Sequence, residues 1–233
     1  MKRSDVNRIM AEADEFIASF GFVLPPFARL SPDELRTLHA RGEADRLVGA
    51  RLGWDITDYG EGRFEEMGLF LFTVRNGSLA DLEAGHGMCY AEKIMISREN
   101  QLSPMHRHVV KAEDIINRGG ATLALELFTS DANGRPDPEQ PITVQCDGLP
   151  RTLEAGGILR LDPGESVTLM PGDWHAFWGE EGDVLIGEVS TVNDDLNDNV
   201  FREPIGRFSA IDEDTAPSSL LVSDYDTWLP ERA

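Results

Sequence analysis

The chain has 233 residues, with 21 Lys or Arg against 42 Asp or Glu and a formal net charge of −21 at pH 7. Such an acidic chain repels phosphate backbones and anionic lipids, so we exclude nucleic acid and membrane surfaces as partners. Its 41% hydrophobic and 27% charged residues are ordinary for a globular protein of one domain, with or without an extension.

The start of the chain has the pattern of helices. Apolar residues recur at helical spacing in a stretch that Ser4 is placed to cap and that Gly21 ends. The capping box Ser31-Pro-Asp-Glu34 opens a second helix, and a third helical piece is expected over residues 43–52. We therefore predict an N-terminal helical extension over residues 1–52.

From residue 53 onwards the pattern changes to short strands separated by turns. The first residues, Trp54–Gly62, are loop-like, and Arg118-Gly-Gly120 is an example of the turn signals that follow. We expect strands at residues 67–75, 90–97, 103–109, 122–128, 142–146, 157–161, 166–170 and 184–190, and a last edge strand at 219–223. Many short strands with frequent turns indicate a β-sandwich or barrel over residues 53–233.

Two remaining features concern the compartment. No window holds eighteen apolar residues and the N-terminus lacks an apolar signal core, so we expect a soluble, cytoplasmic protein. The two cysteines, Cys89 and Cys146, have no metal-ligand spacing and are expected to be buried and reduced.

The strand near residue 106 carries the clearest chemistry. If Met105–Val109 is extended, alternation places His106 and His108 on one face. Glu113 can return towards them on a bend, and a fourth donor would come from His175, directly after a turn. Three imidazoles and a carboxylate form an open site for a first-row divalent metal. The alternative interpretation is that these four side chains only make structural hydrogen bonds.

Other titratable residues bear on the chemistry. Lys111 could reach a substrate oxygen or be solvated. Glu188 is near substrate if its strand face lines the cavity, and is otherwise a charge at the rim. A polar segment that includes Asp194, Glu203 and Arg207 is either a solvated turn or a loop at a barrel mouth, where carboxylates supply a base and arginine binds hydroxyls.

The spacing of the candidate ligands resembles a known superfamily. His106-x-His108-x4-Glu113-x6-Gly120, with Gly164-x7-Gly172-x2-His175 further on, is similar to the two-part pattern of the cupins. One departure is that the proline usual before the second glycine has moved to Pro171, directly beside it. The resemblance implies a mainly β fold, a cupin (double-stranded β-helix or jelly-roll) barrel with an N-terminal helical extension.

Longer runs narrow the resemblance to one family. Residues 92–108 and 111–120 resemble the D-lyxose isomerase family of cupins, as do the flanking segments 54–60, 71–77 and 187–195. The resemblance implies an aldose–ketose isomerase that interconverts D-lyxose with D-xylulose, and often D-mannose with D-fructose, usually as a homodimer. It also implies a divalent metal with manganese preferred, whereas the donor set of three imidazoles and a carboxylate suits Zn, Fe, Co or Ni as well.

The same resemblance implies residue roles. Lys111 and a downstream carboxylate, best matched by Glu203, become the acid/base pair, and Glu188 is the next candidate for the base. Lys111, Glu188, Asp194 and Arg207 are expected to contact substrate. The hypothesis is proton transfer between C2 and C1 through a cis-enediolate held by the metal, with a hydride shift as the open alternative. The implied metal ligands are His106, His108, Glu113 and His175.

Two other functions remain open at this point. An iron-dependent cupin dioxygenase uses the same ligand set and would consume oxygen. A non-catalytic sugar-binding cupin would bind a sugar without turning it over.

Overall fold

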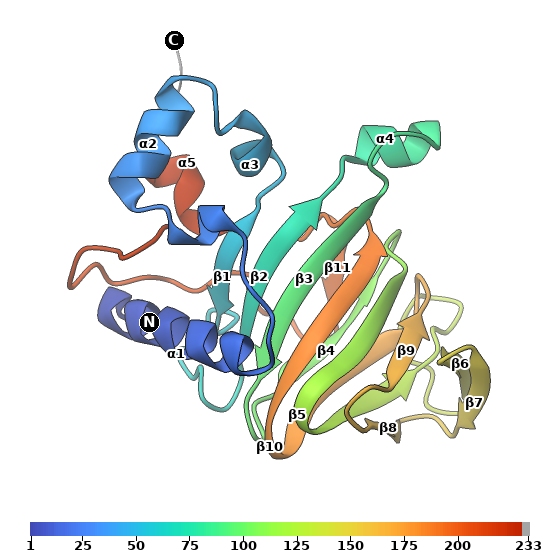
Figure 1. Ribbon diagram of the computed structural model, residues 1–233. Helices are drawn as coiled ribbons and strands as arrows, with labels where there is room; N and C mark the ends of the chain where they lie inside the picture. Colours follow the sequence, from blue (N-terminus) through green and yellow to red (C-terminus); the bar gives the residue numbers. More distant parts are fainter. Residues whose placement is uncertain (230–233) are drawn as a thin grey trace.

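The computed structural model describes residues 1–229, a mainly antiparallel β structure with most of its helices on one side (Figure 1). Its helical elements are α1 (Arg3–Ser19), η1 (Pro26–Arg29), α2 (Pro32–Ala40), α3 (Asp45–Gly49), α4 (Leu79–Ala84), η2 (Val222–Asp224) and α5 (Tyr225–Trp228). Its strands are β1 (Gly53–Thr57), β2 (Leu69–Asn76), β3 (Tyr90–Ser97), β4 (Ser103–His108), β5 (Glu113–Phe128), β6 (Ile142–Cys146), β7 (Leu149–Leu153), β8 (Gly157–Leu161), β9 (Ser166–Leu169), β10 (Trp174–Thr191) and β11 (Asn199–Phe201).

Two long strands, β5 and β10, form the centre of the sheet. The main strand order is β1-β2-β3-β10-β5-β9-β6-β7, with β4 and β8 paired off this path and β11 paired with β4. Residues 174–180 of β10 pair with β4 and with residues 122–128 of β5. Residues 184–190 of β10 pair with β3 and with residues 113–120 of β5. These strands therefore join segments that are distant in sequence around one interior.

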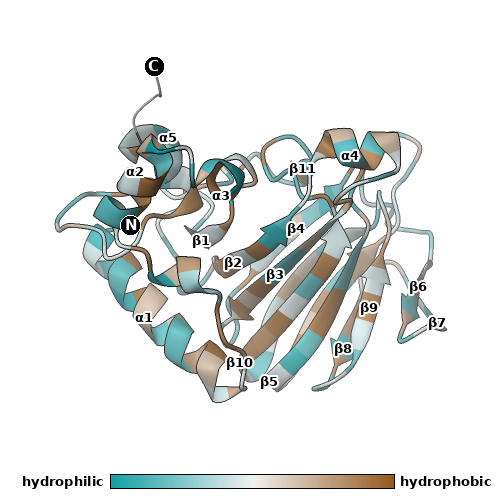
Figure 2. Ribbon diagram, turned by 45° about the horizontal axis from the view of Figure 1, so that its top comes forward, coloured by the Kyte–Doolittle hydropathy of each residue, from teal (hydrophilic) through white to brown (hydrophobic). Residues whose placement is uncertain are grey.

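Alternation along the strands separates two apolar cores. In β2, Leu69 and Leu71 belong to the barrel interior, whereas Phe70 and Phe72 face outwards and pack with α1. The alternating bands of hydropathy along the strands are visible in Figure 2. Because β2 is covered on both faces, nearly all of its residues are buried.

The N-terminal helices agree with the sequence except at their ends. The apolar face of α1 is buried against the sheet, and Ser31 forms the predicted capping box with Glu34. The first helix begins two residues after Met1, however, so Ser4 lies inside it and its hydroxyl donates to Asp214 instead of capping. The third helical piece is shorter than predicted, since α3 covers only five residues.

The strand predictions need several corrections. Two strands are longer than predicted, because β5 begins at Glu113 and β10 at Trp174, where the expected strands began at residues 122 and 184. Residues 53–57, expected as loop, form β1, with Trp54 in the outer core. The expected turn at Gly119 and Gly120 is instead a bend within β5, because both residues have positive φ and the pairing with β10 shifts register there. The expected last strand is reduced to a single bridge between Trp54 and Leu221. The sequence also did not indicate β7 or β11.

The C-terminal segment returns to the start of the chain. Arg3 is fully buried and donates to both carboxylate oxygens of Asp224, at 2.9 Å each, and to Glu213. The division of the chain at residue 53 stays a prediction, and residues 230–233 of the expected barrel segment lie outside the described part. Both cysteines are free, Cys146 buried and Cys89 only partly so. Among the described helices, none has the length and apolar character needed to cross a membrane.

Candidate metal centre and cavity

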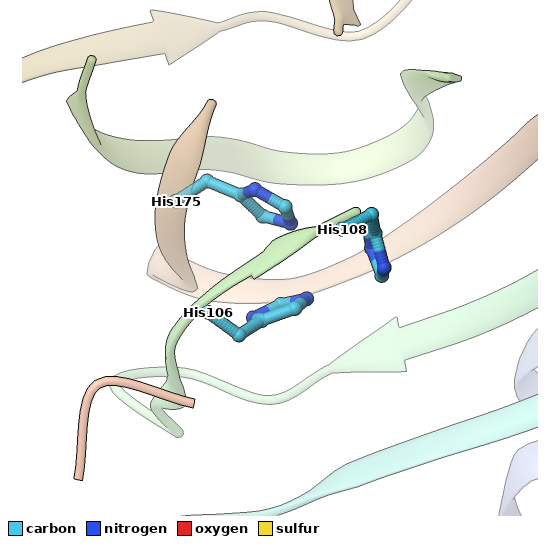
Figure 3. A group of neighbouring side chains, drawn as sticks. All are labelled: His106, His108 and His175. Carbon is cyan, nitrogen blue, oxygen red and sulfur yellow. The ribbon is translucent and has the colours of Figure 1, made fainter. Parts of the chain in front are cut away.

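Three imidazoles meet at one end of the barrel interior. His106 and His108 lie on the same face of β4, and the register of β4 with β10 places His175 directly opposite His106. Ring nitrogens of the three residues lie within 4.8 Å of one another, and the rings face a common space in Figure 3. These three histidines could therefore hold a metal ion.

Backbone carbonyls orient two of the rings. Nδ1 of His106 lies 2.9 Å from the Pro104 carbonyl oxygen, and Nδ1 of His175 lies 3.2 Å from that of Asp173. Because a carbonyl only accepts, each Nδ1 carries the proton and each Nε2 keeps its lone pair. Metal-binding histidines are commonly fixed by such second hydrogen bonds.

Glu113 completes the group on the side of β5. Its Oε1 lies 3.3 Å from Nε2 of His108 and 3.2 Å from Nε2 of His175. This oxygen and both ring nitrogens of His108 are buried without a hydrogen-bond partner among the described residues. Buried polar atoms without partners are rare, and a cation between Nε2 of His108 and Oε1 of Glu113 would satisfy these two acceptors. The residues present thus fit a divalent metal.

The electrostatics keep His106 and His175 neutral and the carboxylate of Glu113 charged. Burial lowers the pKa of His175 to about 4 and, together with His175 and His108, lowers that of His106 well below its usual range. Burial alone would raise the pKa of Glu113, but Lys111 and the nearby imidazoles outweigh it and lower that pKa well below its usual value. These are the protonation states that metal ligands require.

A chain of buried ion pairs continues from the histidines into the cavity. Lys111 Nζ lies 2.6 Å from Glu113 Oε2 and 3.0 Å from Glu188 Oε1. Lys93 Nζ lies 3.4 Å from the same oxygen of Glu188 and 2.6 Å from Oδ1 of Asn193. Burial opposes the charge on Lys111, but the surrounding carboxylates raise its pKa overall. Lys111 therefore stays an ammonium group.

Arg207 extends this network through Asp195, which also pairs with Lys93. Its guanidinium donates to Asp55 at 2.7 Å and to Asp195 at 3.0 Å. Burial would raise the pKa of Asp195, but Lys93 and Arg207 lower it well below its usual range. Charged and hydroxyl groups therefore surround a cavity of about 40 Å³, which apolar side chains such as Phe177 and Phe201 also line.

The cavity brings together most of the predicted site residues. The four predicted ligands line it, and so do Lys111, Glu188 and Arg207. Glu203 does not: it follows β11 in an exposed loop, where its side chain is 69% exposed and lies near Arg202. Asp194 is also outside this cavity, because its carboxylate accepts hydrogen bonds from Leu196 and Asn197 within its own turn.

Sequence reasoning missed three residues of this region. Lys93 is buried on β3, directly before the apolar residues 94–96, and this position was an available signal. Asp195, rather than its neighbour Asp194, lines the cavity. Asp198 accepts hydrogen bonds from the bend between β4 and β5, which no local pattern indicates.

Comparison with known sequences gives a whole-chain match. A family model described as D-lyxose isomerase matches residues 1–225. A D-lyxose/D-mannose isomerase of Serratia proteamaculans is 49% identical over 227 residues, which cover 97% of this chain and 98% of the relative. A D-lyxose/D-mannose isomerase of Escherichia coli O157:H7 is 45% identical over the same coverage.

Comparison with solved structures supports the fold. The L-ribose isomerase of Cellulomonas parahominis, solved with L-ribose, matches with a TM-score of 0.60 at 14% identity, covering 91% of this chain and 98% of that one. The L-ribose isomerase of Acinetobacter sp. DL28, in complex with L-ribose, matches with the same TM-score, identity and coverage. The predicted cupin-like β fold with N-terminal helices is confirmed.

Proposed function

The chain belongs to the D-lyxose isomerase family and is a sugar isomerase, and we propose that it interconverts D-lyxose with D-xylulose and D-mannose with D-fructose. The two relatives carry both aldoses in their names. D-Lyxose and D-mannose share their configuration at C2, C3 and C4, so one set of contacts around the reacting carbons serves both. The observation that carries the proposal is the convergence of three imidazoles on a cavity that also holds Lys111 and Glu188.

We propose His106, His108, His175 and Glu113 as the ligands of one divalent metal, with manganese preferred. The buried Oε1 of Glu113 and Nε2 of His108, which lack hydrogen-bond partners among the described residues, support this assignment. A bound divalent cation would act as a Lewis acid that makes the proton next to the sugar carbonyl more acidic. The four side chains contribute one negative charge, so they leave the cation partly uncompensated.

We propose Glu188 as the carboxylate that moves the proton between C2 and C1. It is 3% exposed and lines the cavity, whereas Glu203, the base inferred from resemblance, has an exposed side chain in a loop outside the cavity. Lys111, 3.0 Å from Glu188, would donate to the sugar oxygen that gains charge as the proton leaves carbon. The proton taken from C2 is returned to C1, and the proton that O2 loses replaces the one that Lys111 gives to O1, so no external acid or base is consumed.

Arg207, Lys93 and Asp195 are proposed to bind the hydroxyl groups remote from the reacting carbons. Their side chains line the cavity, and Arg207 and Lys93 both contact Asp195. Fixed donors and acceptors of this kind discriminate between sugars that differ at one hydroxyl, because a missing partner leaves a buried polar group unsatisfied. A homodimer and a cytoplasmic location remain predictions, the first of which light scattering would test.

The test compares Glu188→Gln with Glu203→Gln in metal-loaded protein. Isomerisation of D-lyxose and D-mannose in deuterated water is followed by NMR, which also reports deuterium entering at C1 or C2. We expect Glu188→Gln to lose turnover by about 10²- to 10⁴-fold while still binding metal, and Glu203→Gln to resemble the wild type. A loss of turnover in Glu203→Gln alone would identify Glu203 as the base. A product without deuterium would favour a hydride shift. Absence of isomerisation by the wild type with any divalent metal would refute the function.

A further inference from the structure

One carboxylate holds the bend that joins the metal-binding strands. Asp198 Oδ1 accepts the backbone N–H groups of Val109 at 2.9 Å and Val110 at 2.7 Å, and its Oδ2 accepts that of Lys111 at 2.9 Å. Asp198 is 8% exposed, so these bonds are largely shielded from water. Three consecutive N–H groups pointing at one anion form a nest whose conformation depends on that anion.

The position of this bend gives Asp198 its importance. The bend follows His108, the last residue of β4, and contains Lys111, while Glu113 opens β5 two residues later. Any rotation of the peptide units at 109–111 would therefore move two predicted ligands and the proposed proton donor together. Shielded N–H groups need partners, and within residues 1–229 the one other bond that these three groups donate is longer, from Val109 N to the Asp198 carbonyl at 3.3 Å.

The same carboxylate faces the ring of His108. Oδ2 of Asp198 lies 3.9 Å from Nδ1 of His108, beyond hydrogen-bond distance but close enough to favour a proton on that nitrogen. The Nε2 lone pair of His108 is then directed towards Glu113 and the other imidazoles. Asp198 would thus orient the ring of His108 through Nδ1, as the Pro104 carbonyl orients the ring of His106.

Asp198 is itself fixed from the other side. Its backbone N–H donates to the Asp194 carbonyl at 2.9 Å, and the next residue, Asn199, begins β11 opposite His108. The carboxylate is therefore presented from a turn and a strand that are both hydrogen-bonded in place. It acts as a rigid acceptor and not as a mobile surface charge.

We propose that Asp198 is a positioning residue of the isomerase: it sets the conformation of residues 109–111 and thereby the placement of His108, Lys111 and Glu113. The proposal rests on the proposed function only for its catalytic consequence. Its structural consequence, an ordered bend that binds metal well, can be measured without any sugar.

The test uses Asp198→Asn, with Asp198→Glu as the variant that keeps the charge. An amide offers one acceptor oxygen and turns an NH₂ group towards the nest, so at least one N–H loses its partner. We expect the folded Asp198→Asn protein to bind Mn²⁺ or Co²⁺ about 10- to 100-fold more weakly. The visible absorption spectrum of bound Co²⁺ should change, and amide exchange at 109–111 should accelerate. Asp198→Glu should recover part of each effect, and kcat for D-lyxose should fall more than KM changes.

The matched control is Asp131→Asn. Asp131 also accepts backbone N–H groups of a turn, those of Asn133 at 2.8 Å and Arg135 at 2.9 Å, but it does not line the cavity. This variant should keep wild-type metal affinity and Co²⁺ spectrum. An Asp198→Asn protein with wild-type affinity, spectrum and amide exchange would overturn the proposal. A wild type that binds metal but isomerises no sugar would refute the proposed function alone, because the exchange and affinity measurements would still decide the role of Asp198.

Discussion

Lys111 and Glu188 form an ion pair inside the barrel, with Nζ 3.0 Å from Oε1 and both side chains less than 5% exposed. The two residues are 77 positions apart, one on the bend after β4 and the other near the end of β10. Because Lys111 also lies 2.6 Å from Glu113, a single ammonium group links the predicted metal ligands to the proposed base.

Replacing Lys111 with methionine should therefore affect both stability and catalysis. Glu113 would lose its nearest cation, and breaking a buried pair by removing one partner costs about 3–5 kcal/mol. Turnover of D-lyxose should fall by about 10²-fold or more, because no donor remains for the sugar oxygen. Urea denaturation and kcat measure the two effects. Lys111→Arg keeps the charge and should recover stability better than turnover; equal recovery of both would argue against proton donation by Lys111.

The metal-free protein should become less stable as the pH falls from about 6.5 towards about 4. The pKa of His175 is about 4 in the folded chain and that of His106 is also well below 6.5, so in this range the unfolded chain binds more protons. Protonation of the unfolded state then favours unfolding, and His175 alone accounts for about 3 kcal/mol across the range.

Urea denaturation at several pH values measures this dependence, with metal removed by a chelator. His175→Gln cannot titrate, so its free energy of unfolding should depend less steeply on pH over the same range. An equally steep dependence in His175→Gln would assign the effect to other groups, such as the carboxylates.

Removing the metal should lower the melting temperature, and returning it should restore the original value. A ligand that binds only the folded chain stabilises it by about 2.7 kcal/mol at a concentration 100 times its dissociation constant. Differential scanning calorimetry with Mn²⁺, Co²⁺ and Zn²⁺ measures the shift, and elemental analysis should find one ion per chain. His106→Ala should abolish the shift, whereas His39→Ala, in α2 and outside the cavity, should retain it.

The junction of the two termini should make a large contribution to stability without affecting the chemistry. Arg3 is fully buried against Asp224 at 2.9 Å, so Arg3→Met leaves a buried carboxylate without its partner and should cost about 3–5 kcal/mol. Arg8→Met removes only exposed pairs, with Glu12 and Asp5, and should cost about 0.5 kcal/mol or less. Urea denaturation measures the free energy of unfolding of both variants. The kcat per folded molecule should be unchanged in both, and a lower kcat in Arg3→Met would show that the contact between Arg3 and Asp224 affects the site.

The sequence determined the parts of this protein that depend on local spacing. The alternation of His106 and His108, the capping box at Ser31 and the apolar face of α1 follow from fixed periodicities of strand and helix, and the structure has all three. Resemblance then identified the family from long runs of residues, and the whole-chain match confirmed it.

Only the tertiary structure decided which distant polar residues share the cavity. Glu203 and Glu188 are both acidic residues downstream of the histidines, and sequence spacing does not distinguish a loop beyond the barrel from an inward position on β10. Asp194 and Asp195 differ in the same way, and the bonds from Asp198 to residues 109–111 span about ninety positions. Such contacts depend on strand register and on the curvature of the closed sheet, which are set by packing across the whole interior and not by the neighbours of each residue in the chain.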